Sequence, residues 1–150
     1  MLQRYTQQQL LGHKGRCFDV RYSYDGNVLL TASEDGTAIL WDLHTQKIKS
    51  ALVHNKESEV LRATFLDRQT SLVATGGADG RAIVWKTELD NNSSSSSSSR
   101  SGSKYTKQLI LQHEKTSQIY ACESLSDHSS NLVTAADSVL YLWDLASTGD

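Results

Sequence analysis

Residues 30–43 read LTASEDGTAILWDL, and two later stretches repeat their pattern: VATGGADGRAIVWKT at 73–87 and VTAADSVLYLWDL at 133–145. Each stretch places an aspartate six residues before a tryptophan, in the pairs Asp35/Trp41, Asp79/Trp85 and Asp137/Trp143. A histidine stands about thirty residues ahead of each tryptophan, at His13, His54 and His113. Three coincident anchors in three copies indicate a chain assembled from repeats of one structural unit.

The segments between these anchors have the residue pattern of β-strands. Apolar side chains alternate with polar ones over residues 18–22, which is the period of a strand with one buried face. Residues 28–33 and 37–43 predict two further strands. Asp35-Gly36 between them predicts a tight turn, because glycine accepts the positive φ that such a turn needs. Residues 46–52 are more polar and predict a fourth strand at the outer edge of the sheet.

The third strand of this unit is apolar on both faces. Ala38 and Leu40 are expected on one side of the sheet, and Ile39 and Trp41 on the other. A sheet with two apolar faces is packed between neighbours. The same plan recurs around residues 60–65, 71–75 and 82–85, and again around 119–122, 132–134 and 139–142. These repeated four-stranded units predict an all-β protein made of propeller blades, and not a sandwich or a barrel.

With these residues in place, the sequence resembles the WD-repeat β-propeller family. The motifs that carry the resemblance are Gly12-His13, Asp25-Gly26 and Trp41-Asp42 in repeat one, and Trp143-Asp144 in repeat three. Repeat two departs from the family pattern, with Val53-His54 in place of Gly-His and Trp85-Lys86 in place of Trp-Asp. These departures suggest weakened blades without changing the fold expected.

We divide residues 1–150, a partial propeller, into three repeats at about 3–43, about 46–87 and about 104–145. An insert at 90–103 contains a run of seven serines. Serine and glycine cannot bury apolar surface, so we expect this insert to be a flexible surface loop. It falls between the third strand of one blade and the outer strand of the next.

The resemblance also implies a buried chain of hydrogen bonds in each blade, from tryptophan to a hydroxyl, to histidine, to aspartate. The matching residues are His13, Thr31 (or Ser33), Asp35 and Trp41, then His54, Thr75, Asp79 and Trp85, then His113, Asp137 and Trp143. Histidine, hydroxyl and aspartate are also the residue types of a catalytic triad, which would indicate a hydrolase. An enzyme needs one triad, whereas these residues recur between repeats and no nucleophile elbow accompanies them, so we favour a structural role.

Repeat three is one residue short between Thr134 and Asp137. If its strands keep the register of the other repeats, Val133 stands where they have a hydroxyl. Thr134 then points to the opposite face, because a shift of one residue turns a strand side chain over. We therefore expect this blade to be the least stable.

The function favoured by the resemblance is a protein-interaction scaffold with no catalysis of its own and no cofactor or metal. Its partners are expected at a narrow face made by the loops before the first strand and between the second and third strands. The candidate contacts are Lys14, Arg16 and Glu34 in blade one, Lys56, Glu57 and Glu59 in blade two, and Glu114 and Lys115 in blade three. Taken singly, each is explained equally well as a solvated surface charge. The alternative is a piece of a larger propeller with an enzymatic or RNA-binding role.

The composition of the chain narrows the candidate functions and the cellular location. A formal net charge of −2 argues against nucleic acid, which binds basic surfaces. Cys17 and Cys122 match no metal-ligand spacing, so we expect two reduced, buried thiols. Residues 1–10 lack the apolar core of a signal peptide, and no apolar run reaches the ~20 residues of a membrane helix. We therefore expect an intracellular protein, in the cytoplasm or the nucleus.

Three blades are too few for a closed ring, because propellers typically contain four to eight. Residues 3–10 predict an outer strand ahead of the first histidine, at the offset by which a WD-repeat terminus completes the last blade. An open stack would expose apolar end faces of the Ile39/Trp41 type. We therefore expect the isolated chain to dimerise, to aggregate or to be a fragment of a larger propeller, and we favour the fragment.

Overall fold

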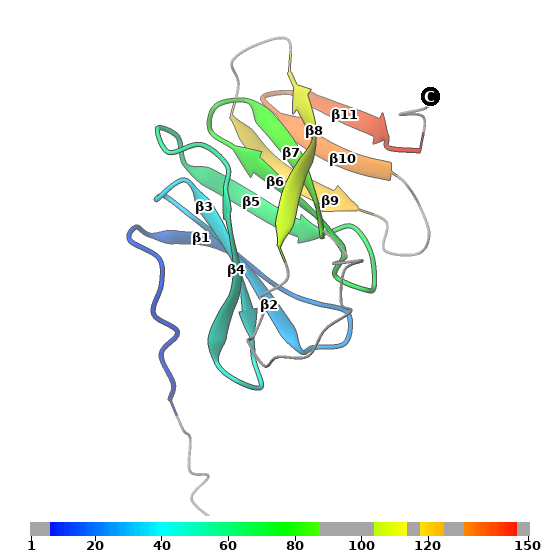
Figure 1. The fold of residues 1–150 in the computed structure, drawn as a ribbon. Coiled ribbons are helices and arrows are strands. Elements are labelled where there is room, and N and C mark those ends of the chain that lie inside the picture. Colours follow the sequence, from blue (N-terminus) through cyan, green and yellow to red (C-terminus); the bar gives the residue numbers. More distant parts are fainter. Residues whose placement is uncertain (1–6, 88–103, 114–117, 125–130, 147–150) are drawn as a thin grey trace, which may run out of the picture.

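The computed structural model describes residues 7–87, 104–113, 118–124 and 131–146, and its regular structure is β-strand (Figure 1). The strands form three antiparallel sheets that follow one another along the chain. The insert expected at 90–103 lies outside the described residues. None of the described segments forms a helix long and apolar enough to cross a bilayer.

Each sheet is built from strands that are consecutive in the sequence. The first sheet contains β1 (Cys17–Tyr22), β2 (Val28–Ser33), β3 (Thr37–Asp42) and β4 (Lys47–Val53). The second contains β5 (Val60–Phe65), β6 (Leu72–Gly77), β7 (Arg81–Thr87) and β8 (Tyr105–Gln112). The third contains β9 (Ile119–Ser124), β10 (Asn131–Ala136) and β11 (Val139–Asp144). The expected all-β architecture of repeated antiparallel blades is confirmed.

Two expectations about outer strands need correction. β8 follows the insert and pairs with β7, so it completes the second sheet and does not belong to the next blade. Residues 7–10 of the strand expected at 3–10 form no strand, and residues 1–6 lie outside the described part. The Gln46 side chain donates a hydrogen bond to Gln8 at 2.7 Å, which holds this segment beside the first sheet.

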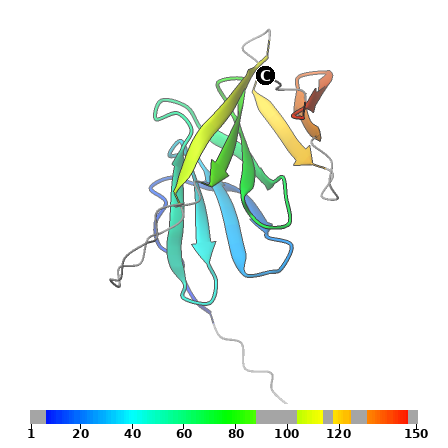
Figure 2. The ribbon, with the colours of Figure 1, turned by 45° about the vertical axis from the view of Figure 1, so that its right-hand side comes forward.

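Figure 2 shows the three sheets side by side. Apolar side chains pack in two layers, one between the first and second sheets and one between the second and third. The first layer contains Val28, Leu30, Ala32, Ala38, Leu40 and Leu52 from the first sheet, and Val60, Ala63, Val73, Ile83, Trp85 and Tyr105 from the second. The second layer includes Ala74, Ala82, Val84, Ile119, Cys122 and Leu132. Full burial of a leucine or isoleucine side chain stabilises the fold by about 1.5–3 kcal/mol, so these layers are the main source of stability.

The first strands of the three sheets are joined by polar contacts. The Ala63 N–H donates to the Asp19 carboxylate at 3.2 Å, between β5 and β1. Arg21 and Glu123 form an ion pair between β1 and β9, which belong to the first and third sheets. An ion pair that joins these two sheets indicates that the innermost strands converge toward a common line, as in a propeller.

The two end faces of the stack are apolar, but not at the residues expected. Ile39 and Trp41 are each only 3% exposed, and Gly12 lies against the Trp41 ring. The expected exposure of an Ile39/Trp41 surface is therefore wrong, because residues 8–13 lie beside that face. The large apolar side chains exposed at the two ends are Val20 (57%) and Tyr22 (69%) in β1, and Leu140 (74%) and Leu142 (69%) in β11.

The turn between β2 and β3 should tolerate a side chain less well than the turn between β1 and β2. Gly36 has φ 77°, and a Cβ added there would lie 2.0 Å from the Asn55 carbonyl oxygen. Gly26 has φ 72° but open space around it. We expect Gly26→Ala to lower the free energy of unfolding by ~1 kcal/mol and Gly36→Ala by about 2–4 kcal/mol, because steric overlap adds to backbone strain. Chemical denaturation measures both; equal costs would contradict the close contact.

Candidate functional site

In the first sheet, the four residues expected to form a polar chain lie within hydrogen-bonding distance of one another. The Trp41 indole N–H donates to Thr31 Oγ1 at 2.9 Å, and this hydroxyl lies 2.7 Å from His13 Nε2. His13 Nδ1 lies 3.0 Å from the Asp35 carboxylate. The Thr31 hydroxyl can donate only one hydrogen bond, and it lies closer to His13 Nε2 than to the Ile39 carbonyl oxygen, which is 3.3 Å away. When the hydroxyl donates to Nε2, His13 carries its own proton on Nδ1 and donates it to Asp35.

The second sheet repeats this arrangement. The Trp85 N–H donates to Thr75 Oγ1 at 2.9 Å, and the hydroxyl lies 2.7 Å from His54 Nδ1. His54 Nε2 lies 3.2 Å from Asp79. The Asn55 side chain also donates to Asp79, at 3.0 Å. The sequence analysis missed Asn55 because it lies outside the repeated anchors; its position directly after the histidine is the only signal.

The third sheet keeps the inner part of the chain and changes the outer part. The Trp143 N–H donates to Thr134 Oγ1 at 2.9 Å, and this hydroxyl lies 3.0 Å from His113 Nε2. The expectation that Val133 takes the hydroxyl position is therefore wrong. The missing residue is lost from the turn after β10, which has two residues and begins at Asp137 with φ 51°. Among the described residues His113 Nδ1 has no hydrogen-bond partner, so the series of hydrogen bonds in this sheet ends at the imidazole.

Hydrogen bonds keep the turn carboxylate of the first sheet charged. Burial alone would raise the pKa of Asp35, but hydrogen bonds from the Thr37 side chain, the Lys14 backbone and His13 lower that pKa to about 2. The Lys14 N–H donates at 2.8 Å and the Thr37 N–H at 3.0 Å. Asp35 thus joins the loop before β1 to the turn between β2 and β3.

The second sheet has the same charge arrangement deeper in the protein. Burial lowers the pKa of His54, and the neighbouring Asp79 only partly offsets this effect. Burial would raise the pKa of Asp79, but hydrogen bonds from Asn55 and His54 lower it. The pair is therefore a neutral imidazole beside a carboxylate near neutral pH. In the third sheet, burial likewise lowers the pKa of His113.

These polar chains do not present a nucleophile to a substrate. The Thr75 hydroxyl is fully buried, accepts the Trp85 N–H and contacts His54. Both ring nitrogens of His54 and of His13 are engaged. Among the described residues, no group of three histidine, cysteine, aspartate or glutamate side chains could hold a metal ion. What the arrangement does is position two loops relative to a sheet.

The two cysteines lie in different environments. Cys122 is buried between the second and third sheets, and burial raises the pKa of its thiol to about 12. Cys17, at the start of β1, is exposed, so the expectation of a buried thiol is wrong there. Both are free thiols.

Four of the expected contact residues lie at one end of the first two sheets; we call Lys14, Arg16, Glu34 and Glu59 the charged rim. Arg16 donates two hydrogen bonds to Glu34, from Nε at 3.0 Å and from Nη2 at 2.9 Å. Hydrogen bonds from Arg16 lower the pKa of Glu34 to about 2. Glu34, with a smaller contribution from Glu59, raises the pKa of Arg16. The rim is therefore a preformed set of charges.

The other four expected contacts are not brought together in the same way. Lys56 and Glu57 are exposed in the loop between β4 and β5, where the Glu57 N–H donates to the Asn55 side chain. Glu114 and Lys115 lie outside the described residues. Their place in the contact surface stays a prediction.

Removing one buried hydroxyl should destabilise the protein even when the volume is conserved. Thr75→Val leaves the Trp85 N–H and the His54 ring nitrogen without their partner. We expect the free energy of unfolding to fall by about 1–3 kcal/mol, the cost of an unpaired buried polar group. Thr75→Ser keeps the hydroxyl and is the matched control. Urea denaturation compares the two; a valine variant as stable as the serine variant would contradict this role.

Acidification should destabilise the protein through its buried histidines. The pKa of His54 is lower in the folded protein than its unfolded value of about 6.5, so below that pH the unfolded state binds a proton that the folded state does not. The stabilisation is complete above pH ~6.5 and declines as the pH falls toward the folded pKa. Urea midpoints from pH 7.5 to 5 measure this, and His54→Gln should flatten the profile. A midpoint that rises on acidification would contradict it.

Comparison with known proteins identifies the repeats. A profile of the WD domain, G-beta repeat family matches residues 4–42 and 105–144, which together are more than half of the chain. The crystal structure of the RRP9 WD40 repeats superposes with a TM-score of 0.71 at 12% identity, covering 93% of this chain and 38% of that one. This likeness supports the fold alone.

Curated relatives share the repeats within longer proteins. Guanine nucleotide-binding protein subunit beta of Zea mays is 25% identical over 92% of this chain and 34% of its own length. Transcription initiation factor TFIID subunit 5 of Caenorhabditis elegans is 32% identical over 55% of this chain and 12% of its own. DDB1- and CUL4-associated factor 10 of Xenopus laevis is 36% identical over 42% and 14%. The chain thus spans between 12% and 34% of these relatives. With its repeats, its blades and this profile match, the chain belongs to the WD-repeat family.

Proposed function

We propose that this chain is a protein-binding scaffold module that holds partner proteins at the charged rim and catalyses no reaction of its own. The observation that carries the proposal is the connection between the rim and the buried polar chain. Asp35 accepts hydrogen bonds from both His13 and the Lys14 backbone, so the core directly positions the loop that bears Arg16. Loops held on a rigid scaffold are where binding usually resides.

The names of the relatives support a role within assemblies. One is a subunit of a transcription initiation factor, one is a DDB1- and CUL4-associated factor, and one is a subunit of a guanine nucleotide-binding protein. We infer that this chain, too, acts as one component among several. A transcription factor among these relatives supports the nucleus as one of its two expected intracellular locations.

The rim suits a polar protein surface better than nucleic acid. Arg16 is 77% exposed although it is paired with Glu34, so both remain accessible to a partner carrying either sign of charge. The formal net charge of −2 gives no general attraction to phosphate. Catalysis or RNA binding within a larger propeller stays an alternative that no observation favours.

Charge reversal at the rim tests the proposal. Proteins captured by the full chain from a cell extract are identified by mass spectrometry, and the affinity of a captured partner is then measured for Arg16→Glu and Lys14→Glu. We expect each variant to weaken binding at least ~10-fold, because each reverses a charge of the preformed rim, and Arg16→Glu also sets a second carboxylate beside Glu34. Lys47→Glu, at the opposite end of the first sheet, is the control. Equal affinity of the rim and control variants would contradict the proposal.

A further inference from the structure

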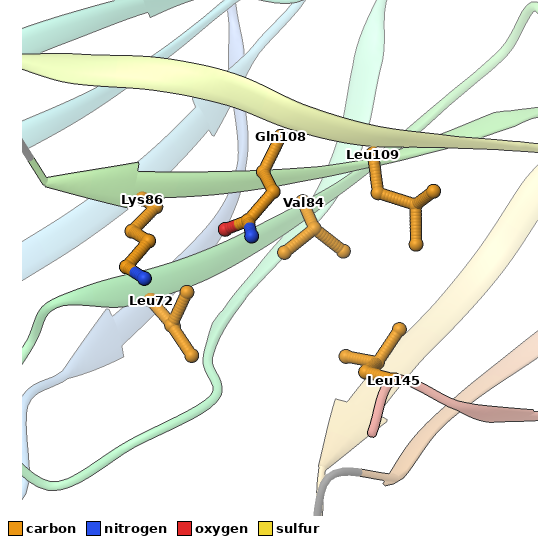
Figure 3. A pocket seen from close by; sticks show the side chains of 6 residues that line it. All are labelled: Leu72, Val84, Lys86, Gln108, Leu109 and Leu145. Carbon is orange, nitrogen blue, oxygen red and sulfur yellow. The ribbon is translucent and has the colours of Figure 1, made fainter. Parts of the chain in front are cut away.

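Two of the cavities differ in the groups that line them. The cavity in Figure 3 lies between the second and third sheets, and its lining consists of Leu72, Val84, Lys86, Gln108, Leu109 and Leu145. This lining contains neither an aromatic ring nor a carboxylate. A second cavity, of about 240 Å³, has both kinds of group together with guanidinium groups. We call it the polar cavity, and its lining includes Arg21, Tyr24, Asp67, Arg68 and Glu123.

The polar cavity lies at the end of the sheets opposite to the charged rim. The rim residues stand before β1, after β2 and before β5, whereas the cavity lies where β1, β5 and β9 end. The Ser124 hydroxyl donates to the Phe65 carbonyl oxygen at 2.8 Å, which joins β9 to β5 at this point. The ion pair of Arg21 with Glu123 joins β1 to β9. All three sheets therefore build the cavity without any rim residue.

The turn between β5 and β6, which carries Arg68, is held in one conformation. The Asp67 carboxylate accepts hydrogen bonds from the Ser71 N–H, at 2.9 Å, and from the Ser71 hydroxyl. Thr70 has φ 60°, which is rare for a β-branched residue, and its carbonyl oxygen accepts the Tyr105 hydroxyl. Such a strained residue persists only where its surroundings fix it. Arg68 therefore extends from a rigid base.

The Tyr24 ring already holds a cation. Arg68 Cζ lies 4.2 Å from the centroid of this ring, so the guanidinium group lies over the ring face. The Tyr24 side chain is 67% exposed, and Arg68 is exposed as well. A cation–π contact between exposed groups is weak, because water competes for the cation. A second guanidinium group can therefore take the place of Arg68, and the ring shows which kind of ligand it accepts.

Carboxylates outnumber guanidinium groups around the polar cavity. Asp19 lies 3.6 Å from Arg21, and Glu123 pairs with the same guanidinium group. With Asp67 and Arg68 included, three carboxylates accompany two guanidinium groups. If Arg68 leaves the Tyr24 ring, three carboxylates accompany one. This excess of negative charge beside an aromatic ring favours a cationic ligand over a carboxylate or a phosphate.

Glu123 is placed to accept a second donor. Its side chain is 53% exposed, and the ion pair with Arg21 uses only the oxygen Oε1. An ionised carboxylate has about four acceptor positions on its two oxygens. Glu123 can thus pair with an incoming guanidinium group while it keeps Arg21.

We propose that the polar cavity binds an arginine side chain of a partner protein, which takes the place of Arg68 over Tyr24 and pairs with Glu123. Arg68 occupies the ring when no partner is bound. Arginine suits the site better than lysine, because a planar guanidinium group stacks on a ring while its edge donates to a carboxylate. The site goes beyond the proposed function, and it does not depend on the charged rim.

An NMR titration of the isotope-labelled full chain with N-acetyl-Gly-Arg-Gly-amide tests the proposal. We expect saturable shifts of the backbone signals of Tyr24, Arg68 and Glu123. The matched control is the same peptide with citrulline in place of arginine, since citrulline keeps the shape of the side chain and has no charge. We expect the citrulline peptide to bind at least ~10-fold more weakly.

Substitutions in the chain identify the groups that bind. Tyr24→Ala and Glu123→Gln should each weaken binding of the arginine peptide at least ~5-fold, because they remove the ring and the charge that hold it. Arg68→Ala frees the ring and removes a like charge, so it should tighten binding at least ~3-fold. Glu57→Gln removes an exposed carboxylate at the opposite end of the sheets and should change nothing. All four residues are exposed, so the variants should keep the circular dichroism spectrum of the parent.

Four results would overturn the proposal. The first is the absence of saturable shifts, and the second is equal affinity for the arginine and citrulline peptides. The third is an unchanged affinity in both Tyr24→Ala and Glu123→Gln. The fourth is weaker binding by Arg68→Ala together with a preference for N-acetyl-Gly-Glu-Gly-amide, which would assign the cavity to an acidic partner. None of these results bears on the charged rim, so the proposed function would stand.

Discussion

The indole N–H of each blade's tryptophan, buried in the first two sheets and partly buried in the third, is the constraint on which the rest of the structure depends. This group only donates, and leaving it unpaired in the core costs about 1–3 kcal/mol. A threonine hydroxyl on the neighbouring strand accepts it in all three sheets, at Thr31, Thr75 and Thr134. The contact fixes the register of the second and third strands. It also places the hydroxyl to meet a histidine from the loop before the first strand, so one buried donor links three parts of a blade.

The third repeat, which is one residue shorter, shows which part of the hydrogen-bonded series is kept. Loss of one residue could have shifted the strand and removed the hydroxyl, but the turn absorbs it instead. The consequence falls on the outer end, where Asp137 adopts a left-handed conformation and His113 Nδ1 has no hydrogen-bond partner among the described residues. The hydrogen bond from Trp143 to Thr134 and the contact of this hydroxyl with His113 are thus kept in the shortened repeat.

Local patterns in the sequence correctly predicted the features that depend on neighbouring residues alone, such as strands and tight turns. The strand at 28–33, the Asp-Gly turns and the two apolar faces of residues 37–43 follow from alternation and from glycine at positive φ. Thr134 was misplaced because counting from the aspartate, or ten residues back from the tryptophan as in the first two repeats, assumes a turn of fixed length and gives Val133. The sequence analysis expected a buried Trp41 indole but also an exposed Ile39/Trp41 end face, and this second expectation failed for another reason. The burial of that face depends on residues 8–13 lying beside the sheet, and no periodicity encodes that contact.

Each sheet has two different faces, and this gives the stack a direction. The face with Leu40 always meets the face with Ala63, so an end face of one kind is matched by the opposite kind and not by itself. The charged rim lies across the strand ends and uses loop residues that belong to neither face. A partner that binds at the rim therefore uses side chains other than those of the two faces. The His13 imidazole joins the rim to the core through Asp35.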